Sequence, residues 1–362
     1  MSQTKQAETQ TKKSRIIGYD VARSLAVFGM VVVNYKVVMG ASENGPEWLV
    51  WLVGLFDGRA AATFVMLAGV GISMLSRKGR ITQDRERIGQ DRLALMKRAV
   101  FLFIVGLLYT PLWPADILHF YGVYIAIAAL LLTASDRQLW SGAIGLSVAF
   151  LLLVFIFDYE KGWDFSTLTY IDFWTVAGMA RHIIFNGFHP VIPWLAFILI
   201  GMWLGRQDVK DSQVRRQILW VGVSVAAIAE TLSYILVKIF PGETGIIFGT
   251  EPMPPMPLYI IAGAGTAIAI ITICLELTFQ YPKARIFSPL VATGQLALTL
   301  YVAHVVIGMG FLEVIGRLEN QTLQFATISA IIFSALAIVF SNYWRKRFQR
   351  GPLEWMMRKI TS

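Results

Sequence analysis

The fold is decided by the stretch Ile16-Ile-Gly-Tyr-Asp20-Val-Ala-Arg23-Ser-Leu-Ala-Val-Phe-Gly-Met30-Val-Val-Val-Asn34-Tyr-Lys-Val-Val-Met-Gly40. It is long and apolar enough to cross a bilayer, whose core of about 30 Å needs about 20 residues of helix. It nevertheless contains Asp20, Arg23 and Asn34. Because polar side chains inside a membrane are costly, we expect this span to line a site or a pathway rather than to serve as a plain anchor.

The composition of the whole chain indicates an integral membrane protein. Of its 362 residues, 56% are hydrophobic and only 15% are charged, and the mean hydropathy is +0.59. The apolar residues form long runs rather than alternating with polar ones, which predicts an all-α polytopic membrane protein with about ten transmembrane helices. The predicted spans are 17–40, 48–75, 97–113, 116–133, 139–157, 190–205, 218–240, 257–279, 289–312 and 322–343.

The positive charges are unevenly distributed between the predicted loops. With the N-terminus placed in the cytoplasm, the predicted outer segments contain only Lys161, Arg181 and Arg317 among the 32 Lys and Arg residues. Four others lie within spans, and the rest lie in segments predicted to be cytoplasmic. This bias follows the positive-inside rule, so it predicts that both termini are cytoplasmic. It also explains the net charge of +9 without a nucleic-acid partner.

The single cysteine, Cys274, lies in a predicted span, which argues against an intramolecular disulfide framework and a thiolate metal site. No metal is expected. The first span follows basic residues, as a signal sequence does, but it is longer than the apolar part of a signal peptide, so we expect it to be retained. These features favour a bacterial inner (plasma) membrane over an organelle membrane.

The domain organisation is expected to be simple. A single transmembrane domain, 16–343, follows a disordered cytoplasmic tail, 1–15, and precedes a basic cytoplasmic tail, 344–362. The outer segment 158–188 is rich in aromatic residues, which prefer the membrane interface. The proline-rich segment 241–257 cannot be helical throughout, so it is expected to form an ordered outer loop or partial cap.

Asp116 and His119 open the predicted span 116–133 on its outer side. Their spacing of three places both side chains on one face of a helix, where the carboxylate could orient the imidazole as a general base. Asp116 could equally cap the helix, with His119 as an interfacial side chain. Both interpretations are compatible and stay open.

Other polar residues lie deep in predicted spans. Asn34 and His304 are expected in the outer half of the membrane, either as functional groups or as structural hydrogen-bonding residues. Asp57 and Arg59 are expected near the midplane, at the depth of Glu230, as an ion-paired cluster or as a grip on a phosphate or carboxylate.

Asp20 and Arg23 are expected to pair near the cytoplasmic surface. His189 is expected in a surface turn, and His182 carries the weakest functional signal of the four histidines.

Several stretches resemble the transmembrane acyltransferases related to heparan-alpha-glucosaminide N-acetyltransferase and to the bacterial YeiB-type proteins. The resemblance begins with residues 15–34 and covers nearly the whole chain. Its other motifs are Ala115-Asp-Ile-Leu-His-Phe-Tyr-Gly122, Ile192-Pro-Trp-Leu-Ala-Phe-Ile-Leu-Ile-Gly-Met-Trp-Leu-Gly-Arg206, Ala292-Thr-Gly-Gln-Leu-Ala-Leu-Thr-Leu-Tyr-Val-Ala-His304 and Gly351-Pro-Leu-Glu-Trp355.

The resemblance implies a membrane-embedded enzyme that takes an acyl group, most simply acetyl, from cytoplasmic acyl-CoA and delivers it to a sugar or other envelope acceptor. The glucosaminide acetyltransferases place a catalytic histidine in the first outer loop or early in the second span, whereas residues 40–74 here contain no histidine. His119 or His304 would then be the general base. Asp116 would orient the imidazole, and Asn34 would hold the acyl carbonyl or its oxyanion.

Substrate binding is expected from residues at several depths of the membrane. The expected partners are membrane lipids, the acyl-CoA donor and a glycan or lipid acceptor, with a homodimer left open. The alternative is a transporter or lipid-handling protein that keeps the fold without acyl transfer, in which the same charges would form a solute or proton route. The predicted substrate-binding residues are Asp57, Arg59, Asp20, Arg23 and Trp194.

Overall fold

A computed structural model describes residues 15–361. The predicted tail 1–15 therefore lies outside the described residues except for Arg15. In chain order the elements are α1 (Gly18–Val38), α2 (Glu47–Gly54), α3 (Arg59–Thr82), α4 (Arg85–Tyr109), α5 (Leu118–Leu130), α6 (Asp136–Ile156), β1 (Trp163–Asp164), β2 (Thr169–Tyr170), α7 (Val176–Arg181), η1 (His182–Asn186), α8 (Val191–Leu204), α9 (Ser212–Ile239), α10 (Glu243–Ile246), α11 (Pro257–Gln280), α12 (Phe287–Gly294), α13 (Ala297–Ala303), η2 (His304–Met309), α14 (Gly310–Val314), α15 (Leu323–Arg347) and α16 (Pro352–Thr361), where η marks a π-helical turn.

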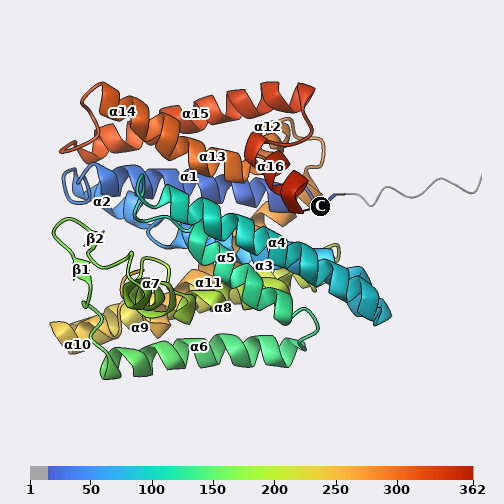
Figure 1. Cartoon of the computed structure of the whole chain (residues 1–362), viewed down its shortest axis with the longest axis horizontal. Coiled ribbons are helices and arrows are strands. Elements are labelled where there is room, and N and C mark those ends of the chain that lie inside the picture. The colour runs from blue at the N-terminus through green and yellow to red at the C-terminus, as the bar shows by residue number, and fades with distance from the viewer. Residues whose placement is uncertain (1–14, 362) are drawn as a thin grey trace, which may run out of the picture.

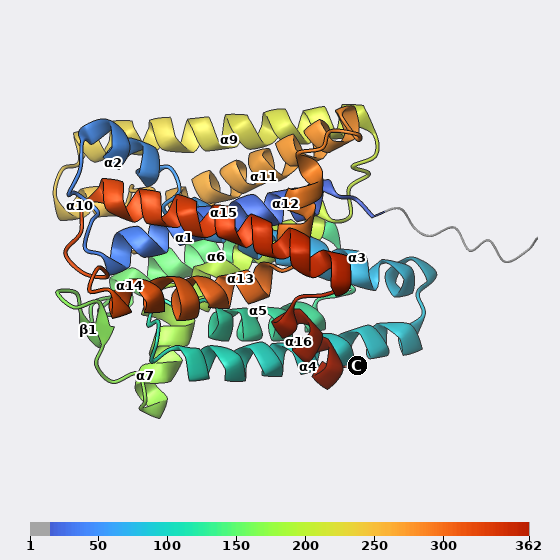
Figure 2. The same ribbon diagram turned by 90° about the horizontal axis from the view of Figure 1, so that it is seen from above.

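The long helices run side by side along one direction and form a bundle (Figures 1 and 2). One end of the bundle carries the start of α1, the turn between α3 and α4, and helix α16. We call it the basic end, because a cavity there is lined by Arg15, Arg23, Arg77, Arg98, Arg206 and Lys210. The opposite end, the loop end, carries α2, the β1–β2 hairpin, α7 and α10. Both ends of the described chain lie at the basic end, as an even number of crossings requires, and the cytoplasmic placement of that end stays a prediction.

The number of membrane crossings depends on the short and broken helices. Within residues 15–361, seven helical segments are long and apolar enough to cross a membrane, or up to eight if the bent pair Val176–Asn186 and Val191–Leu204 forms one span. Helix lies in each of the ten predicted ranges. Two of these ranges contain helices that are not both long and apolar enough to count as candidate spans. They are the ranges of α4, whose first half is rich in charge, and of α5, which has only 13 residues.

The predicted second span, 48–75, is not one continuous helix. Helix α2 ends at Gly54, and α3 begins at Arg59 after Gly58, whose φ of +67° is left-handed. A glycine tolerates this conformation without the steric cost of a Cβ. Helix α3 alone has 24 residues, about 36 Å at a rise of about 1.5 Å per residue. Asp57 and Arg59 therefore lie at the break between α2 and α3, and the two helices together form one of the seven candidate spans, Glu47–Thr82.

The predicted span 289–312 is broken as well, and the C-terminal segment supports it. Helix α12 ends at Gly294 and α13 starts at Ala297. The carboxylate of Glu354, in α16, accepts hydrogen bonds from the backbone nitrogens of Leu298 and Thr299 at 2.8 and 3.1 Å and from the Thr299 hydroxyl at 2.5 Å. It therefore caps the start of α13. The segment predicted as a basic tail is thus helical, in α15 up to Arg347 and in α16.

Helices α3 and α8 pack closely against each other in the bundle. A Cβ on Gly69 would overlap the carbonyl oxygen of Ile198, and one on Gly201 would overlap that of Met66. Helices in a membrane gain little from the hydrophobic effect and rely on such small residues for close van der Waals contact.

The segment 158–188, predicted to be on the outer side, folds over the loop end of the bundle. It forms the β1–β2 hairpin, in which Trp163 pairs with Tyr170, and then α7 and η1. Trp163, Tyr170 and Phe173 are buried and pack together. Their rings therefore cover the protein interior as well as lying near the predicted interface.

Candidate active site

A small cavity lies inside the bundle toward the loop end, and we call it the central cavity. Its volume is about 230 Å³, and its polar lining includes Asn34, His189 and Tyr301. It is lined by Leu168 and Phe188 from the segment 158–188 and by Pro252 and Met253 from the segment 241–257, so these two segments cover it. Ligand sites typically measure about 300–1,000 Å³, so this cavity suits the reacting groups of substrates rather than entire molecules. The remaining lining residues are Met30, Val33, Val37, Phe56, Gly58, Ala60, Ala61, Trp113, Ala115 and Ile117.

Asn34 on α1 and His304 on η2 contact each other directly. The Asn34 amide nitrogen lies 2.9 Å from His304 Nε2, and His304 Nδ1 faces the backbone carbonyl of Tyr301. That carbonyl can only accept, so Nδ1 carries the proton and Nε2 accepts from Asn34. His304 is fully buried, whereas Asn34 is half-buried and lines the cavity. His304 thereby fixes the orientation of the Asn34 amide.

Asp116 and His119 form the predicted pair, and Tyr301 connects it to the central cavity. His119 Nδ1 lies 3.1 Å from Asp116 Oδ2, and both side chains are fully buried. The same carboxylate accepts from the backbone nitrogens of Leu118 and His119, so Asp116 caps α5 and orients the imidazole at once. The Tyr301 hydroxyl donates to Asp116 Oδ1 at 3.4 Å and accepts from the backbone nitrogen of Ile117 at 3.2 Å.

His119 itself lies behind the cavity wall, in an aromatic cage. Its ring centroid is 4.1 Å from Phe120, 5.9 Å from Phe173 and 5.7 Å from the stacked ring of His182. His119 Nε2 has no hydrogen-bond partner among residues 15–361. His119 does not line the central cavity, whereas Tyr301, which bonds to Asp116, does.

The sequence interpretation missed His189 and His182. His182, which was expected to carry the weakest functional signal, is buried in the aromatic cage because the segment 158–188 folds inward over it. His189 is not part of an exposed turn: it is half-buried, lines the central cavity and packs edge-on against Trp194 with ring centroids 4.6 Å apart. Its position before the Pro-Trp motif and after an aromatic-rich segment is the one sequence signal that could have indicated burial.

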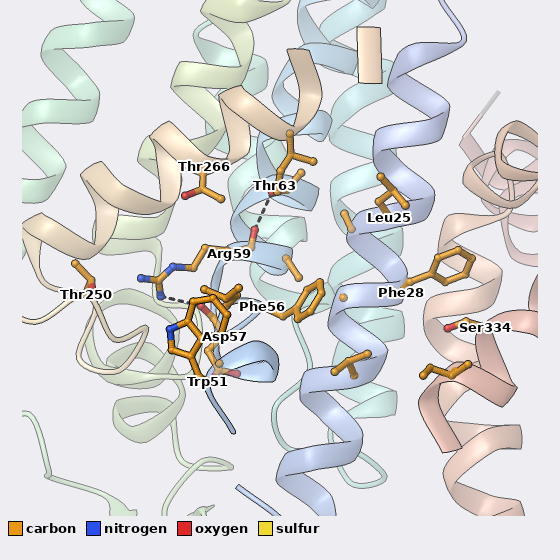
Figure 3. A pocket seen from close by; sticks show the side chains of 18 of the residues that line it. Leu25, Phe28, Trp51, Phe56, Asp57, Arg59, Thr63, Thr250, Thr266 and Ser334 are labelled. Carbon is orange, nitrogen blue, oxygen red and sulfur yellow. Dashed lines mark hydrogen bonds between the residues drawn. The ribbon is translucent and has the colours of Figure 1, made fainter. Parts of the chain in front are cut away.

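A second, larger cavity opens beside α1, and we call it the side groove (Figure 3). Its volume is about 1230 Å³. Arg59 at its loop end donates to Glu230 Oε1 at 2.6 Å and to the backbone carbonyl of Asp57 at 2.9 Å, and its guanidinium lies over the Tyr259 ring. The Asp57 carboxylate pairs instead with Lys36 at 2.5 Å. The predicted ion-paired cluster is therefore present as two pairs.

The cavity at the basic end has a volume of about 950 Å³ and contains Asp20 and Arg23. Asp20 is buried and pairs with Arg23 at 3.0 Å and with Arg15 at 2.6 Å. The hydrogen bonds to Asp20 raise the pKa of the Arg15 guanidinium, which precedes the first span. Basic side chains outnumber acidic ones among the residues that line this cavity, so it suits an anionic ligand.

The nine predicted site residues thus fall into three groups and one outlier. Asn34, His304, Asp116 and His119 form one network through Tyr301, which the sequence interpretation did not single out. Asp57 and Arg59 lie in the side groove, and Asp20 and Arg23 lie in the basic cavity. Trp194 is fully buried in the core and lines none of the three cavities. Within residues 15–361 no group of three or more His, Cys, Asp or Glu side chains is arranged to hold a metal ion.

Comparisons with known proteins extend over the whole described chain. The family model described as heparan-alpha-glucosaminide N-acetyltransferase, catalytic, matches residues 15–235, and one described as a protein of unknown function (DUF418) matches residues 202–362. The chain is 24% identical over 383 residues to the uncharacterized protein YeiB of Escherichia coli K12, with 96% of each chain covered. It is 22% identical over 367 residues to an uncharacterized 39.9 kDa protein in the amylase 3' region of Bacillus acidopullulyticus, with 96% of this chain and 94% of the relative covered.

Proposed function

This chain belongs to the YeiB-type membrane proteins of the heparan-alpha-glucosaminide N-acetyltransferase catalytic family, and on that premise we propose that it is a membrane acyltransferase. The donor is cytoplasmic acyl-CoA, most simply acetyl-CoA, and the acceptor is a hydroxyl or amine of a sugar-bearing envelope molecule. The observation that carries the proposal is the placement of two cavities along one helix. The first half of α1 lines the basic cavity and its second half lines the central cavity.

The basic cavity suits the nucleotide end of coenzyme A. Its arginines can pair with phosphates through charge-assisted, bidentate hydrogen bonds. Arg23 in this cavity and Asn34 in the central cavity are separated by about 16 Å of helix, at a rise of about 1.5 Å per residue. An extended pantetheine arm can cover that separation, which would bring the thioester from the basic end to the central cavity.

Asn34 is the group best placed to bind the acyl carbonyl. Its amide nitrogen carries two protons; one is directed to His304 Nε2, and the other is available to an oxygen in the cavity. A donor held in place before the reaction stabilises the negative charge that develops on the carbonyl oxygen. His304 acts here as a positioning residue, because its Nε2 is already bonded to Asn34.

His189 is the histidine best placed to accept a proton, because it lines the cavity while His119 does not. In the proposed reaction the acceptor hydroxyl loses its proton to His189 as its oxygen forms a bond to the acyl carbon. The bond from that carbon to sulfur breaks, and the proton passes to the departing thiolate of coenzyme A. Asp116 and His119 hold Tyr301 and the start of α5 in place behind the cavity.

The test is acyl transfer by the purified protein in lipid nanodiscs, with radiolabelled acetyl-CoA as donor and alkyl glucosides as acceptors. The wild type is expected to label the glucoside, and His189→Gln is expected to lower kcat about 10²- to 10⁴-fold, the usual contribution of a general base, while leaving the KM for acetyl-CoA unchanged. Asn44→Ala, an exposed residue of the loop end, is the control. No labelled product from the wild type, together with an unchanged thermal stability on adding coenzyme A, would reject the enzyme and favour a transporter.

A further inference from the structure

We propose that the side groove binds a glycolipid, with the alkyl chain lying along α1 and a neutral sugar headgroup held at Arg59, Glu230 and Thr250. The inference rests on the proposed function only where it identifies this glycolipid as the acyl acceptor. The binding site itself follows from the shape, polarity and charge of the groove.

The apolar part of the groove is formed by residues that recur at helical spacing along one face of each helix. Leu25, Phe28, Gly29 and Val32 of α1 form its floor, and residues of α11 and α15 form its two walls (Figure 3). The wall of α15 extends from Ile331 to Ile338, about 10 Å at a rise of about 1.5 Å per residue. It therefore provides an apolar slot of about one third of a bilayer core of about 30 Å. The wall residues are Thr266, Ile270, Ile331, Ser334, Ala335 and Ile338.

The polar part of the groove lies at the loop end, where a lipid headgroup would face. Glu230 accepts from Arg59 at 2.6 Å and from the Thr250 hydroxyl at 2.8 Å, so a ligand meets both donors and acceptors there. The side chain of Glu230 remains 44% exposed, which leaves it accessible to a ligand. An amphipathic molecule with its headgroup at the loop end and its chain directed toward the membrane interior matches this polarity.

The charged side chains in the polar part of the groove indicate whether an anionic or a neutral lipid headgroup binds there. Asp57, Glu230 and Glu251 line the groove with Arg59, and Lys36 pairs with Asp57. Three carboxylates therefore face two cations, which disfavours an anionic phosphate headgroup. Hydroxyl groups of a sugar can donate to carboxylates and accept from Arg59, as buried polar recognition requires. The geometry therefore favours a neutral, hydroxyl-rich headgroup.

The side groove and the central cavity share a wall. Phe56, within the break between α2 and α3, and Ala60, in the first turn of α3, line both. A headgroup at Arg59 is thus separated from the space containing Asn34 and His189 by these two side chains. A sugar hydroxyl that passes Phe56 would enter the central cavity while the alkyl chain stays in the groove.

The experiment uses a dodecyl glucoside with a photoreactive diazirine in its alkyl chain, added to the full-length protein in nanodiscs. Mass spectrometry of the crosslinked peptides is expected to place the label on α15 between Ile331 and Ile338 and on the facing part of α11. Excess dodecyl glucoside should compete, and dodecyl phosphate should not. Ser334→Trp, which fills the slot, should reduce the labelling at least tenfold. Ile332→Trp, at an exposed residue of α15 that does not line the groove, should leave it unchanged, and equal thermal unfolding midpoints verify that both variants fold.

Three results would overturn the binding site: label spread evenly over α6, α9 and α15, equal competition by dodecyl phosphate, or crosslinks that join two copies of the chain through the groove. A transfer assay separates the site from the proposed function. Dodecyl glucoside is expected to be acetylated at least tenfold more efficiently than methyl glucoside, and equal rates would reject the groove as an acceptor site. Specific groove labelling with no acetyl transfer to either acceptor would support the lipid site and contradict the acyltransferase.

Discussion

Replacing Asn34 by alanine tests the chemistry of the central cavity, and the contacts of Asn34 give the size of the effect. The side chain donates to His304 Nε2 at 2.9 Å and, in the proposed reaction, to the acyl oxygen. Loss of one such oxyanion donor typically lowers kcat about 10²- to 10³-fold, or about 2.7–4 kcal/mol in activation free energy. The variant also leaves a fully buried nitrogen of His304 without its donor, which should lower the free energy of unfolding by about 1–3 kcal/mol.

Single-turnover kinetics with radiolabelled acetyl-CoA measures the first effect, and thermal unfolding in detergent measures the second. Asn342→Ala is the matched control, because among residues 15–361 the Asn342 amide bonds only to the Ile338 carbonyl of its own helix. If His304 acts only by orienting Asn34, the double variant with His304→Ala should be no slower than Asn34→Ala alone. An Asn34→Ala rate within twofold of the wild type, or rate losses that multiply in the double variant, would refute the assigned roles.

Three further predictions concern the cap of α13, ligand binding in the basic cavity and the crossing of α3 and α8. Glu354→Ala removes the carboxylate that caps α13 and should lower the free energy of unfolding by about 1–3 kcal/mol; an unchanged thermal midpoint would show that this cap is dispensable. Arg98→Ala should raise the KM for acetyl-CoA about tenfold or more, the value of a charge-assisted hydrogen bond, with kcat unchanged, whereas Arg345→Ala outside the basic cavity should have no effect. Gly69→Ala should destabilise the crossing of α3 and α8 by about 1–3 kcal/mol, and Gly145→Ala, inside α6 where a Cβ meets open space, should unfold at or slightly above the wild-type midpoint; equal midpoints for the two would refute the close crossing.

The sequence was sufficient to predict helices and local pairs. Long apolar runs indicate where helices lie, and positions three apart on a helix must share a face. Asp20 with Arg23 and Asp116 with His119 were therefore predicted as pairs, and both pairs are present. The grouping of Arg59 with Glu230 followed from their expected depth and is also present.

Contacts between distant segments could not be predicted in the same way. Asn34 and His304 are 270 positions apart, and no periodicity indicates that they bond to each other. His189 was assigned to a surface turn and His182 was given the weakest functional signal, because the burial of both arises from tertiary folding of an aromatic segment, which composition alone associates with the membrane interface. The break at Gly58 was missed because a glycine within an apolar run is compatible with a continuous helix.

In the proposed mechanism an acetyl group crosses from the basic end to an acceptor reached from the loop end. The most direct measurement adds radiolabelled acetyl-CoA outside sealed proteoliposomes that contain methyl glucoside at high concentration inside. We predict labelled acetyl glucoside in the lumen for the wild type and about 10²- to 10⁴-fold slower labelling for His189→Gln. If the acceptor is labelled only when donor and acceptor occupy the same side of the membrane, this result would contradict acetyl transfer across the membrane.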